Sequence, residues 1–252
     1  SIKLVPGISG VVTAGNYGGY FNAAPGSFVE IYGVGMGEST RLWGGGDFSA
    51  GRAPTTLDDV SVTIGGKPAF VNYISPGQIN AQVPGDAGLG TQPVVVTWKG
   101  DPSPAVNLTI RERSGGLLAP PAFLVGQRQF VVAVHADGTL VSRGINGVPD
   151  SPALPGETIL FYGVGFGPVS GSTPVAGQTV TALNSLTTAV DFRIDGATAE
   201  VSYAGLTPGL VGLYQFNVTV PQNASAGDLE LQVRQGGVTT DQGILFLPVR
   251  RP

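Results

Sequence analysis

Hydrophobic and polar residues alternate with a period of two along many short segments of this chain. In "SFVEIYGV" (residues 27–34) apolar side chains surround Glu30, and in "VSVTIGG" (residues 60–66) every second residue is Val or Ile. Successive side chains of a strand point to opposite faces of a sheet, so this spacing predicts half-buried β-strands. Glycine pairs and an Asp-Gly follow such segments, as turn residues between strands do. No apolar stripe at helical spacing extends over ten residues, and the pattern therefore predicts an all-β fold.

The chain contains the same pattern twice. With an offset of 130 residues, "PGSFVEIYGVGMG" (residues 25–37) aligns with "PGETILFYGVGFG" (residues 155–167). With an offset of 137 residues, "QINAQVP" (residues 78–84) aligns with "QFNVTVP" (residues 215–221). The two offsets differ by seven residues, which indicates one loop insertion in the second copy.

Two tandem domains follow from this repeat. A length of 252 residues fits either one large β domain or two ordinary domains. The segment "RERSGG" (residues 111–116) interrupts the strand pattern between the copies. We expect two immunoglobulin-like β-sandwiches, in residues 1–112 and 113–252, with residues 117–149 supplying the first strands of the second domain.

The repeated glycine motif, "GVGMG" in one copy and "GVGFG" in the other, raises the question of a nucleotide-binding loop. Such a loop needs a helix directly after the glycines, because the helix N-terminus holds the phosphate. The residues that follow each motif, "ESTRLWGGG" and "PVSGSTPVAG", are not helical in pattern, and neither copy has a Walker lysine. We interpret the motif as a strand-end corner, in which glycine takes positive φ or lets two backbones pack closely.

Composition and charge exclude several classes of function. Charged residues make up 12% of the chain, the formal net charge is −4, and the basic residues are scattered. A nucleic-acid partner is therefore not expected, because it requires a clustered basic face. No apolar run approaches the roughly 20 residues of a membrane-spanning helix. The absence of cysteine excludes disulfides and thiolate metal sites.

Three segments carry a resemblance to known families: "APGSFVEIYG", "YISPGQINAQVP" and "YAGLTPGLVGLYQFNVTVP". Each half of the chain resembles an IPT/TIG immunoglobulin-like domain. The whole chain resembles the Solibacter-type uncharacterised C-terminal domain family of exported bacterial proteins. The resemblance implies a tandem immunoglobulin-like fold and an extracellular or cell-surface location after removal of a signal peptide. It supplies no catalytic residue and no cofactor.

The residues themselves predict no catalytic, cofactor or metal site. His135 is the single histidine, and we expect it at a strand end before an Asp-Gly turn, without a "G-x-S-x-G" elbow that would suggest a Ser-His-acid site. The 17 carboxylates lie mostly in predicted turns, and no "D-x-D-x-D-G" loop is present. A calcium site built from loops between the domains and a glycosidase-type carboxylate pair remain open alternatives.

Two apolar regions are candidates for assembly. The N-terminal segment is either the first strand of its own sandwich or a strand that adds to the sheet edge of a neighbouring subunit. The inserted "LTPGLVGLY" covers either the domain junction or a partner subunit. The candidate contact residues of these two regions are Ile2, Leu4, Val5, Ile8, Val11, Val12, Leu206 and Leu210.

Trp43, in the Gly-rich loop "RLWGGGDF", is a candidate binding residue. Its ring would stack on a sugar, fill a pocket of a neighbour, or fold back over its own sandwich.

These observations lead to a first hypothesis of an exported, non-enzymatic subunit of an extracellular filament or surface assembly. It would polymerise head-to-tail with copies of itself through sheet edges and terminal strands. The alternative is an adhesin or carbohydrate-binding accessory module that recognises a surface glycan. A hydrolase with a site built from loops is a third hypothesis.

Overall fold

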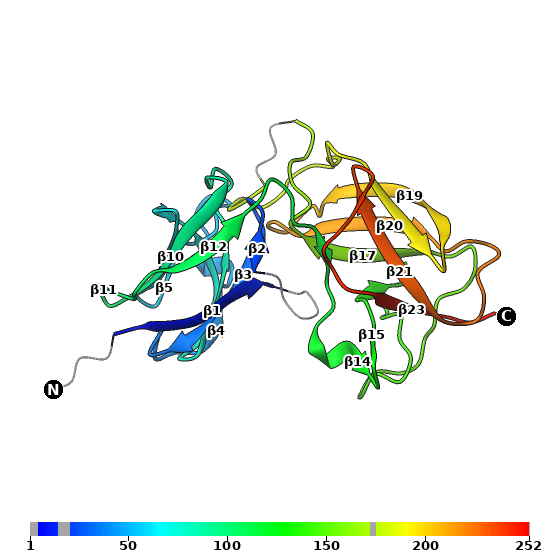
Figure 1. The fold of residues 1–252 in the computed structure, drawn as a ribbon, viewed down its shortest axis with the longest axis horizontal. Helices are drawn as coiled ribbons and strands as arrows, with labels where there is room; N and C mark the ends of the chain where they lie inside the picture. Colours follow the sequence, from blue (N-terminus) through cyan, green and yellow to red (C-terminus); the bar gives the residue numbers. More distant parts are fainter. Residues whose placement is uncertain (1–4, 15–20, 172–174, 252) are drawn as a thin grey trace.

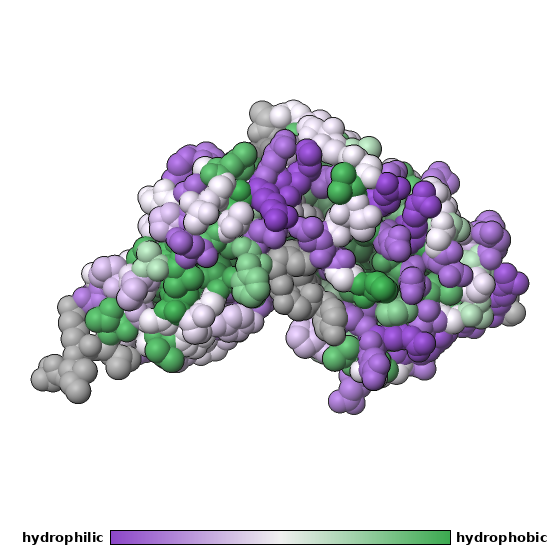
Figure 2. Space-filling view, in the orientation of Figure 1, coloured by the Kyte–Doolittle hydropathy of each residue, from purple (hydrophilic) through white to green (hydrophobic). Residues whose placement is uncertain are grey.

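The computed structural model describes residues 5–14, 21–171 and 175–251, and it shows two β-sandwiches in succession along the chain (Figure 1). One apolar core draws on residues 11–110 and the other on residues 117–249. The helical elements of the described residues are two short 3-10 turns, η1 (Gly45–Asp47) and η2 (Pro121–Phe123). The expected all-β fold of two tandem immunoglobulin-like sandwiches is confirmed. In Figure 2 the two lobes are distinct, and hydrophilic residues gather over the second lobe.

The first sandwich consists of two sheets whose strands are almost all antiparallel. One sheet has the order β1 (Gly7–Thr13), β3 (Phe28–Val34), β9 (Gln78–Gln82), β8 (Phe70–Ile74) and β4 (Arg41–Leu42). The other has the order β2 (Asn22–Ala23), β12 (Val106–Ile110), β10 (Gly90–Trp98), β6 (Val60–Ile64) and β5 (Thr56–Leu57), with β7 (Lys67–Pro68) beside β6 and β11 (Asp101–Pro102) beside β10. The apolar side chains that alternate along the sequence fill the space between the two sheets, and Val60, Val62 and Ile64 are all buried there.

The second sandwich repeats this plan with a longer central strand. Its path is β13 (Gly116–Leu117), β17 (Thr158–Val164), β20 (Tyr214–Thr219), β19 (Ala197–Leu206), β18 (Val190–Ile194), β21 (Gly227–Gln235) and β22 (Val238–Thr239). Further short strands are β16 (Ala133–Val134) beside β17, β23 (Leu245–Val249) beside β21, and the hairpin of β14 (Leu124–Val125) and β15 (Arg128–Gln129). Strand β19 pairs with β18 at its start and with β20 further along, so it joins the two layers.

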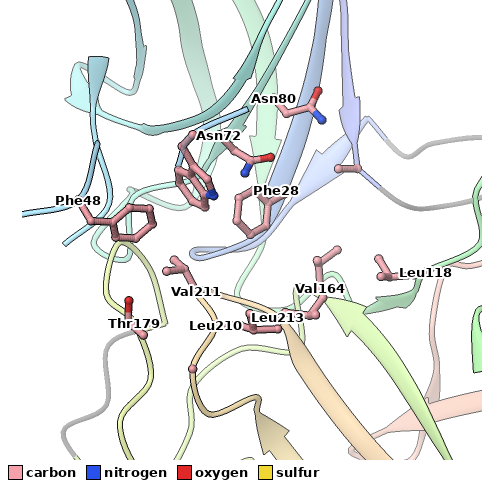
Figure 3. Close-up of a pocket in the computed structure, with 13 residues that line it drawn as sticks. Phe28, Phe48, Asn72, Asn80, Leu118, Val164, Thr179, Leu210, Val211 and Leu213 are labelled. Atoms are coloured by element: carbon pink, nitrogen blue, oxygen red, sulfur yellow. The ribbon is translucent and has the colours of Figure 1, made fainter. Parts of the chain in front are cut away.

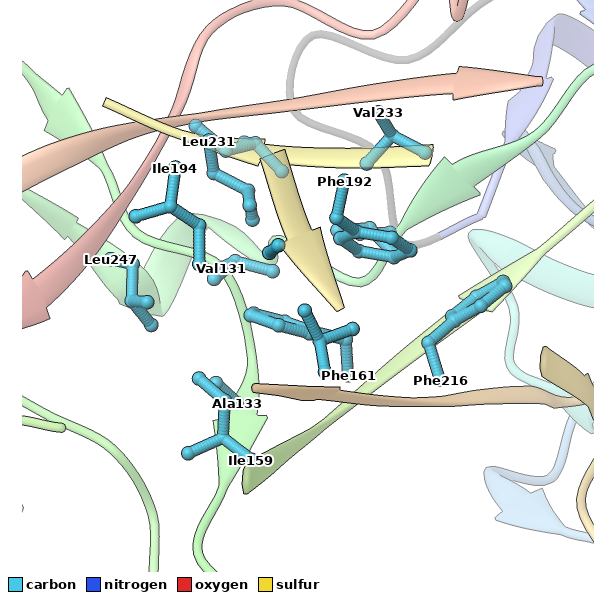
Figure 4. Packing of buried hydrophobic residues seen from close by; sticks show 14 of the residues in the cluster. Val131, Ala133, Ile159, Phe161, Phe192, Ile194, Phe216, Leu231, Val233 and Leu247 are labelled. Carbon is cyan, nitrogen blue, oxygen red and sulfur yellow. The ribbon is translucent and has the colours of Figure 1, made fainter. Parts of the chain in front are cut away.

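Aromatic side chains fill the second core (Figure 4). The rings of Phe161 and Phe192 lie 5.5 Å apart in a stacked arrangement, and those of Phe192 and Phe216 lie 5.2 Å apart. All three side chains are fully buried. Because each comes from a different strand, they hold β17, β18 and β20 together across the sandwich.

Both copies carry the same irregularity in the strand that corresponds to β8 of the first copy. The pairing register shifts between Val71 and Tyr73, and again between Val201 and Tyr203. Such a bulge places one additional residue in the strand and re-aims its side chain. The additional residues are Asn72 in the first copy and Ser202 in the second.

The repeated glycine motif ends a strand in each copy, as the sequence predicts. A Cβ atom on Gly33 would lie 2.0 Å from the carbonyl oxygen of Gly7, and one on Gly163 would lie 2.6 Å from that of Gly116. The first glycine of the motif therefore permits close approach of the neighbouring strand, β1 or β13. Among the described residues no α-helix follows the motif in either copy.

The remaining residues of the motif turn the chain over the core. Gly35 has a φ of 64° and Gly165 a φ of 80°, in the left-handed region that glycine enters without strain. The turn places Met36 and Phe166 at equivalent positions, each with no exposed surface. The heptapeptide is thus repeated because both sandwiches need the same corner and the same buried side chain at its end.

Candidate functional site

The two domains are joined through the buried side chain of Gln82, at the end of β9. Its Nε2 donates hydrogen bonds to the carbonyl oxygens of Gly26 (2.9 Å) and Val175 (3.2 Å). Its Oε1 accepts a hydrogen bond from the backbone N–H of Gly177 (2.9 Å). One side chain of the first domain therefore satisfies backbone groups of the second.

Backbone contacts extend this junction. The N–H of Ala53 donates to the carbonyl of Gly177 (3.0 Å), and the N–H of Thr179 donates to the carbonyl of Gly51 (2.9 Å). Gly177 has positive φ and lies so close to Phe70 that a Cβ atom would be 2.0 Å from the ring. Phe70 and Ala176 are both buried in this contact. The segment of the second domain at residues 175–179 is fixed on the surface of the first.

Beside this junction lies a pocket of about 370 Å³ whose walls come from both domains (Figure 3). The first-domain wall follows the order of the strands in the sheet, because each member lies on or directly after one of β1, β3, β9, β8 and β4. Its members are Ala14, Phe28, Asn80, Asn72 and Trp43, with Phe48 from the following loop. The second-domain wall consists of Leu118, Val164, Thr179, Gly209, Leu210, Val211 and Leu213.

The insertion that distinguishes the second copy supplies much of the second wall. Hydrogen bonds hold this loop against its own domain: the N–H of Gly209 donates to the carbonyl of Val180 (2.8 Å), and the N–H of Val180 donates to that of Leu210 (2.9 Å). Leu210 is 45% exposed and faces the pocket. Leu206 is completely buried in the core of the second domain. The interpretation of Leu206 as a contact residue is therefore wrong, because strand β19 extends further than the loop pattern indicates.

Trp43 lies half-buried in the first-domain wall. Its ring meets the ring of Phe28 edge-on at 6.1 Å and that of Phe48 at 5.2 Å. The side chain does fold back over its own sandwich, and in that position it also lines the pocket. A position folded back over its own sandwich and a role in binding, which the sequence leaves as alternatives for Trp43, are therefore compatible.

An ionic network fixes the loop that carries Trp43. The Arg41 guanidinium bonds both carboxylate oxygens of Asp47 (2.9 and 3.1 Å) and those of Asp58 (2.9 to 3.1 Å). Asp47 also accepts a hydrogen bond from the N–H of Gly44 (2.7 Å), and Ser39 donates one to Asp58 (2.6 Å). Hydrogen bonds from Arg41 lower the pKa of both carboxyl groups. The loop is thus held from both ends across residues 41–47.

Polar groups without protein partners face the pocket. Among the described residues, neither the indole N–H of Trp43 nor the side-chain amide of Asn72 has a hydrogen-bond partner. The Oδ1 of Asn80 accepts a hydrogen bond from Nε2 of Gln78 (2.8 Å), which leaves the NH₂ of Asn80 as a donor. The described residues that line the pocket include no Asp, Glu, His, Lys or Arg. The pocket therefore offers uncharged donors on an apolar, aromatic background.

His135 lies before a turn, as expected, and forms a group that resembles a catalytic triad. Its Nδ1 is 2.5 Å from Oε1 of Glu157, and its Nε2 is 3.2 Å from Oγ of Ser151. However, Nε2 is closer to the backbone carbonyl of Ser151, at 3.0 Å. Both ring nitrogens therefore face acceptors and both must donate, so no lone pair remains to take the proton of the hydroxyl. We interpret the group as a structural ion pair.

The pKa of His135 agrees with this interpretation. Burial lowers the pKa, but hydrogen bonds to Glu157 and to the carbonyl of Ser151 outweigh burial and raise it above the ordinary value. The described residues contain no group of three or more His, Asp or Glu side chains placed to hold a metal ion, at the domain junction or elsewhere. No helix within the described parts of the chain is long and apolar enough to cross a membrane.

The N-terminal candidates occupy different environments. Ile2 and Leu4 lie outside the described residues, and Val5 is 47% exposed. Ile8 packs against the first core, and Val11 is buried within it. Val11 is therefore a core residue and not an assembly contact, because β1 pairs with β3 of its own domain.

The two terminal strands differ in their free edges. Strand β1 is the last strand of its sheet, and no described residue pairs with its outer edge. Strand β23 pairs with β21 on one side and forms bridges to Phe130 and Ala153 on the other. The C-terminal strand therefore has few backbone groups left for a partner, whereas β1 keeps an open edge.

Comparison with known proteins finds structural likeness but no family. No protein-family model and no curated protein matches the chain. A Bacteroides ovatus mixed-linkage glucan utilization protein, SGBP-B, in complex with a mixed-linkage heptasaccharide aligns over 92% of this chain and 43% of its own, with 11% identity and a TM-score of 0.37. The surface glycan-binding protein PbSGBP-B of Prevotella bryantii aligns over 94% and 41%, with 10% identity and a TM-score of 0.30. Domains 5-6 of the S-layer protein SbsC align over 98% and 99%, with 11% identity and a TM-score of 0.31.

The chain spans less than half the length of the two glycan-binding chains. Likeness at this level concerns the fold and carries no conclusion about a ligand or an assembly.

Proposed function

We propose that this chain is a non-enzymatic, exported binding module whose interdomain pocket takes a neutral glycan at the cell surface. The observation that carries the proposal is the convergence, in an aromatic pocket, of donors on Trp43, Asn72 and Asn80 that no described residue engages. Buried indole and amide groups normally find partners, so donors left open in a cleft indicate a site for a ligand with acceptor oxygens.

The chemistry of the pocket favours a carbohydrate over other ligands. A sugar ring has apolar C–H faces that pack on aromatic rings and hydroxyl groups that accept hydrogen bonds. Phe28, Trp43 and Phe48 offer the apolar surface, and the amides of Asn72 and Asn80 offer donors. An anionic ligand would find no cation among the described lining residues. A purely apolar ligand would bury the amides without partners, at a cost in free energy.

The absence of titratable groups in this lining supports a binding role over a hydrolytic one. Glycoside hydrolysis needs a pair of carboxyl groups on either side of the scissile bond. The described residues of the pocket supply no carboxyl group. Asp47 and Asp58, the first two carboxylates after Trp43 in the chain, are engaged by Arg41.

Binding of immobilised neutral glycans by the purified protein and by Trp43→Ala tests the proposal. The other tryptophan, Trp98, lies outside the pocket, so Trp98→Phe is the matched control and also leaves Trp43 as the only indole fluorophore. We expect saturable binding that Trp43→Ala abolishes and Trp98→Phe preserves, with a change in Trp43 fluorescence on titration. Equal binding by the wild type and Trp43→Ala would contradict the proposal.

A second candidate function, assembly with copies of itself, is favoured by the open edge of β1. Unpaired N–H and C=O groups on an edge strand accept a strand from another chain, and repetition of a contact that does not close gives a filament. Val12 is half-buried and lies on this edge strand, where a lysine discourages strand addition. We expect Val12→Lys to abolish filaments in negative-stain electron microscopy, while Leu89→Lys, at an exposed site away from the edge, leaves them intact. Monodisperse wild-type monomers at all concentrations would contradict assembly.

A further inference from the structure

The outer face of the β1-β3-β9-β8-β4 sheet continues beyond the pocket as a polar and aromatic surface. Glu30 on β3 lies opposite Asn80 on β9, and Tyr32 lies opposite Gln78. Val29 and Ile31 are buried in the core. Side chains of a strand alternate between its two faces, so Phe28, Glu30 and Tyr32 point outward. The row that begins in the pocket at Phe28 and Asn80 therefore extends along β3 to Tyr32.

Tyr32 is fixed on this face by its own strand. Its hydroxyl donates a hydrogen bond to Oε2 of Glu30, two residues earlier on the same side of β3. A tyrosine that reaches a side chain two residues away on its own strand must lie along the strand, with its ring over the sheet. Tyr32 is 39% exposed, so part of the residue remains open to solvent. The ring is therefore a pre-oriented stacking surface, which reduces the entropy lost on binding.

The electrostatics preserve this arrangement over the physiological pH range. Burial, together with the hydrogen bond to Glu30, raises the pKa of Tyr32 to about 12. The phenol therefore remains a neutral hydrogen-bond donor to Glu30. Gln78, beside them, donates to Asn80 through Nε2 and keeps its Oε1 as a second acceptor.

The length of this surface exceeds one sugar ring. Phe28 and Tyr32 are four residues apart on one strand, which corresponds to about 13 Å at a rise of about 3.3 Å per residue. We propose that the ligand is an oligomeric or polymeric neutral glycan, one part of which occupies the interdomain pocket while the following residues lie along β3 and stack on Tyr32. This inference rests on the proposed function of the pocket and specifies the length and course of its ligand.

The internal repeat shows that this surface belongs to the first domain. The second copy has Thr158, Leu160 and Ser202 at the positions of Phe28, Glu30 and Asn72, and it keeps a tyrosine, Tyr162, at the position of Tyr32. The pair Gln215 and Asn217 keeps the hydrogen bond of Gln78 and Asn80, at the same 2.8 Å. The shared amide pair and the tyrosine position are thus part of the sandwich, whereas Phe28 of the pocket and Glu30, which holds the Tyr32 hydroxyl, occur in the first copy alone.

A length series of oligosaccharides tests the inference. Soluble β-glucan, xylan, galactomannan and starch would first be screened by affinity electrophoresis. The retained polysaccharide would then be cut into oligosaccharides from the disaccharide to the hexasaccharide for calorimetry. We expect Kd to decrease with length. Tyr32→Ala should weaken hexasaccharide binding about five- to tenfold and leave disaccharide binding unchanged, as expected for loss of one stacking contact.

Matched variants separate failure of this inference from failure of the proposed function. Tyr32→Phe keeps the ring and should retain most of the hexasaccharide affinity, while Trp43→Ala should weaken every length. If Tyr32→Ala and the wild type bind the hexasaccharide equally while Trp43→Ala is impaired, the proposed course of the ligand along β3 is wrong. Glycan binding in the pocket is then still supported. If no polysaccharide is retained, both the pocket function and the extended course are overturned. Unchanged thermal unfolding of Tyr32→Ala would show that the fold is intact.

Discussion

The Oε1 of Gln82 in the first domain accepts a hydrogen bond from the backbone N–H of Gly177 in the second, at 2.9 Å and without exposure to solvent. The same side chain also donates to Gly26 and Val175. The equivalent position of the second copy is Thr219, which is half-buried and bonds Thr158 across the strands. The residue that ties the domains together is therefore one at which the two copies differ.

Gln82→Ala should loosen the domain junction. The change leaves the N–H of Gly177 and the carbonyl of Val175 buried without their partner, at a cost of about 1–3 kcal/mol. Urea unfolding should show a lower midpoint, and small-angle scattering should show a wider range of interdomain arrangements. Thr219→Ala is the matched control and should leave the scattering profile unchanged. An unaltered profile for Gln82→Ala would contradict the role of this residue.

The repeated glycine corner predicts two destabilising variants. In Gly33→Ala and Gly163→Ala the new methyl group meets a backbone oxygen at 2.0 and 2.6 Å, which the neighbouring strand cannot avoid without moving. Each should reduce the free energy of unfolding by about 1–3 kcal/mol. Gly10→Ala is the control, because its Cβ atom would have no neighbour within 4 Å. It should change stability by less than about 0.5 kcal/mol, and a loss equal to that of Gly33→Ala would argue against the steric explanation.

Leu206 and Leu210 should respond differently to truncation. Leu206 has no exposed surface, so Leu206→Ala should reduce stability by about 2–5 kcal/mol through lost burial and a cavity. Leu210 is 45% exposed in the pocket wall, so Leu210→Ala should leave the thermal midpoint nearly unchanged and weaken glycan binding. Calorimetric melting and glycan titration of both variants would measure these effects. A strong loss of stability in Leu210→Ala would contradict the placement of Leu210 in the exposed pocket wall.

The ion pair of His135 and Glu157 predicts a pH-dependent stability. The pKa of His135 is raised in the folded protein, so its contribution is fully present below the unfolded value of about 6.5. The contribution is lost as the pH rises through the folded value. Wild-type protein should therefore lose thermal stability over this range relative to His135→Gln. Parallel melting curves of the two proteins across neutral pH would show that the pair does not contribute.

Arg41 should act on binding through the loop of Trp43. Arg41→Ala releases Asp47 and Asp58 and with them the loop that carries Trp43 and Phe48. Near-ultraviolet circular dichroism and Trp43 fluorescence should change, and glycan affinity should decrease. Arg41→Lys should not restore the affinity, because an ammonium group cannot bond two carboxylates in a bidentate manner. Full affinity in Arg41→Lys would show that charge alone is sufficient.

The fold could be predicted from sequence to a large extent, because its signals are local. The period of two in residues 60–64 and the turn residues after it predict a strand and a turn, and the structure has β6 there. The glycine corner could be recognised because it occurs twice and no helix follows it. Leu206 shows the limit of local signals: the pattern indicates a loop there, but β19 continues to that residue, whereas β8 of the first copy ends at Ile74, before Pro76 at the position of Leu206.

The sequence predicts only some of the residues of the candidate site. Trp43 and Leu210 were identified from their types and their loops. Phe28, Asn72 and Asn80 were not, since each is one polar or aromatic residue on the outer side of a strand. A difference between the copies could have indicated two of them, because Phe28 and Asn72 align with Thr158 and Ser202, whereas Asn80 aligns with Asn217 and gives no such signal.

By itself the sequence determined two all-β sandwiches, their order, and the corner that both share, because strand period, turn residues and repetition are written along the chain. Only the tertiary structure decided that the loop insertion of the second copy meets the outer face of the first, with Trp43 and Leu210 on opposite sides of one pocket. The physical reason is that this arrangement depends on the angle between the domains. That angle is set by the buried hydrogen bonds of Gln82 and by the close contact of Gly177 with Phe70, between residues about 95 to 107 positions apart.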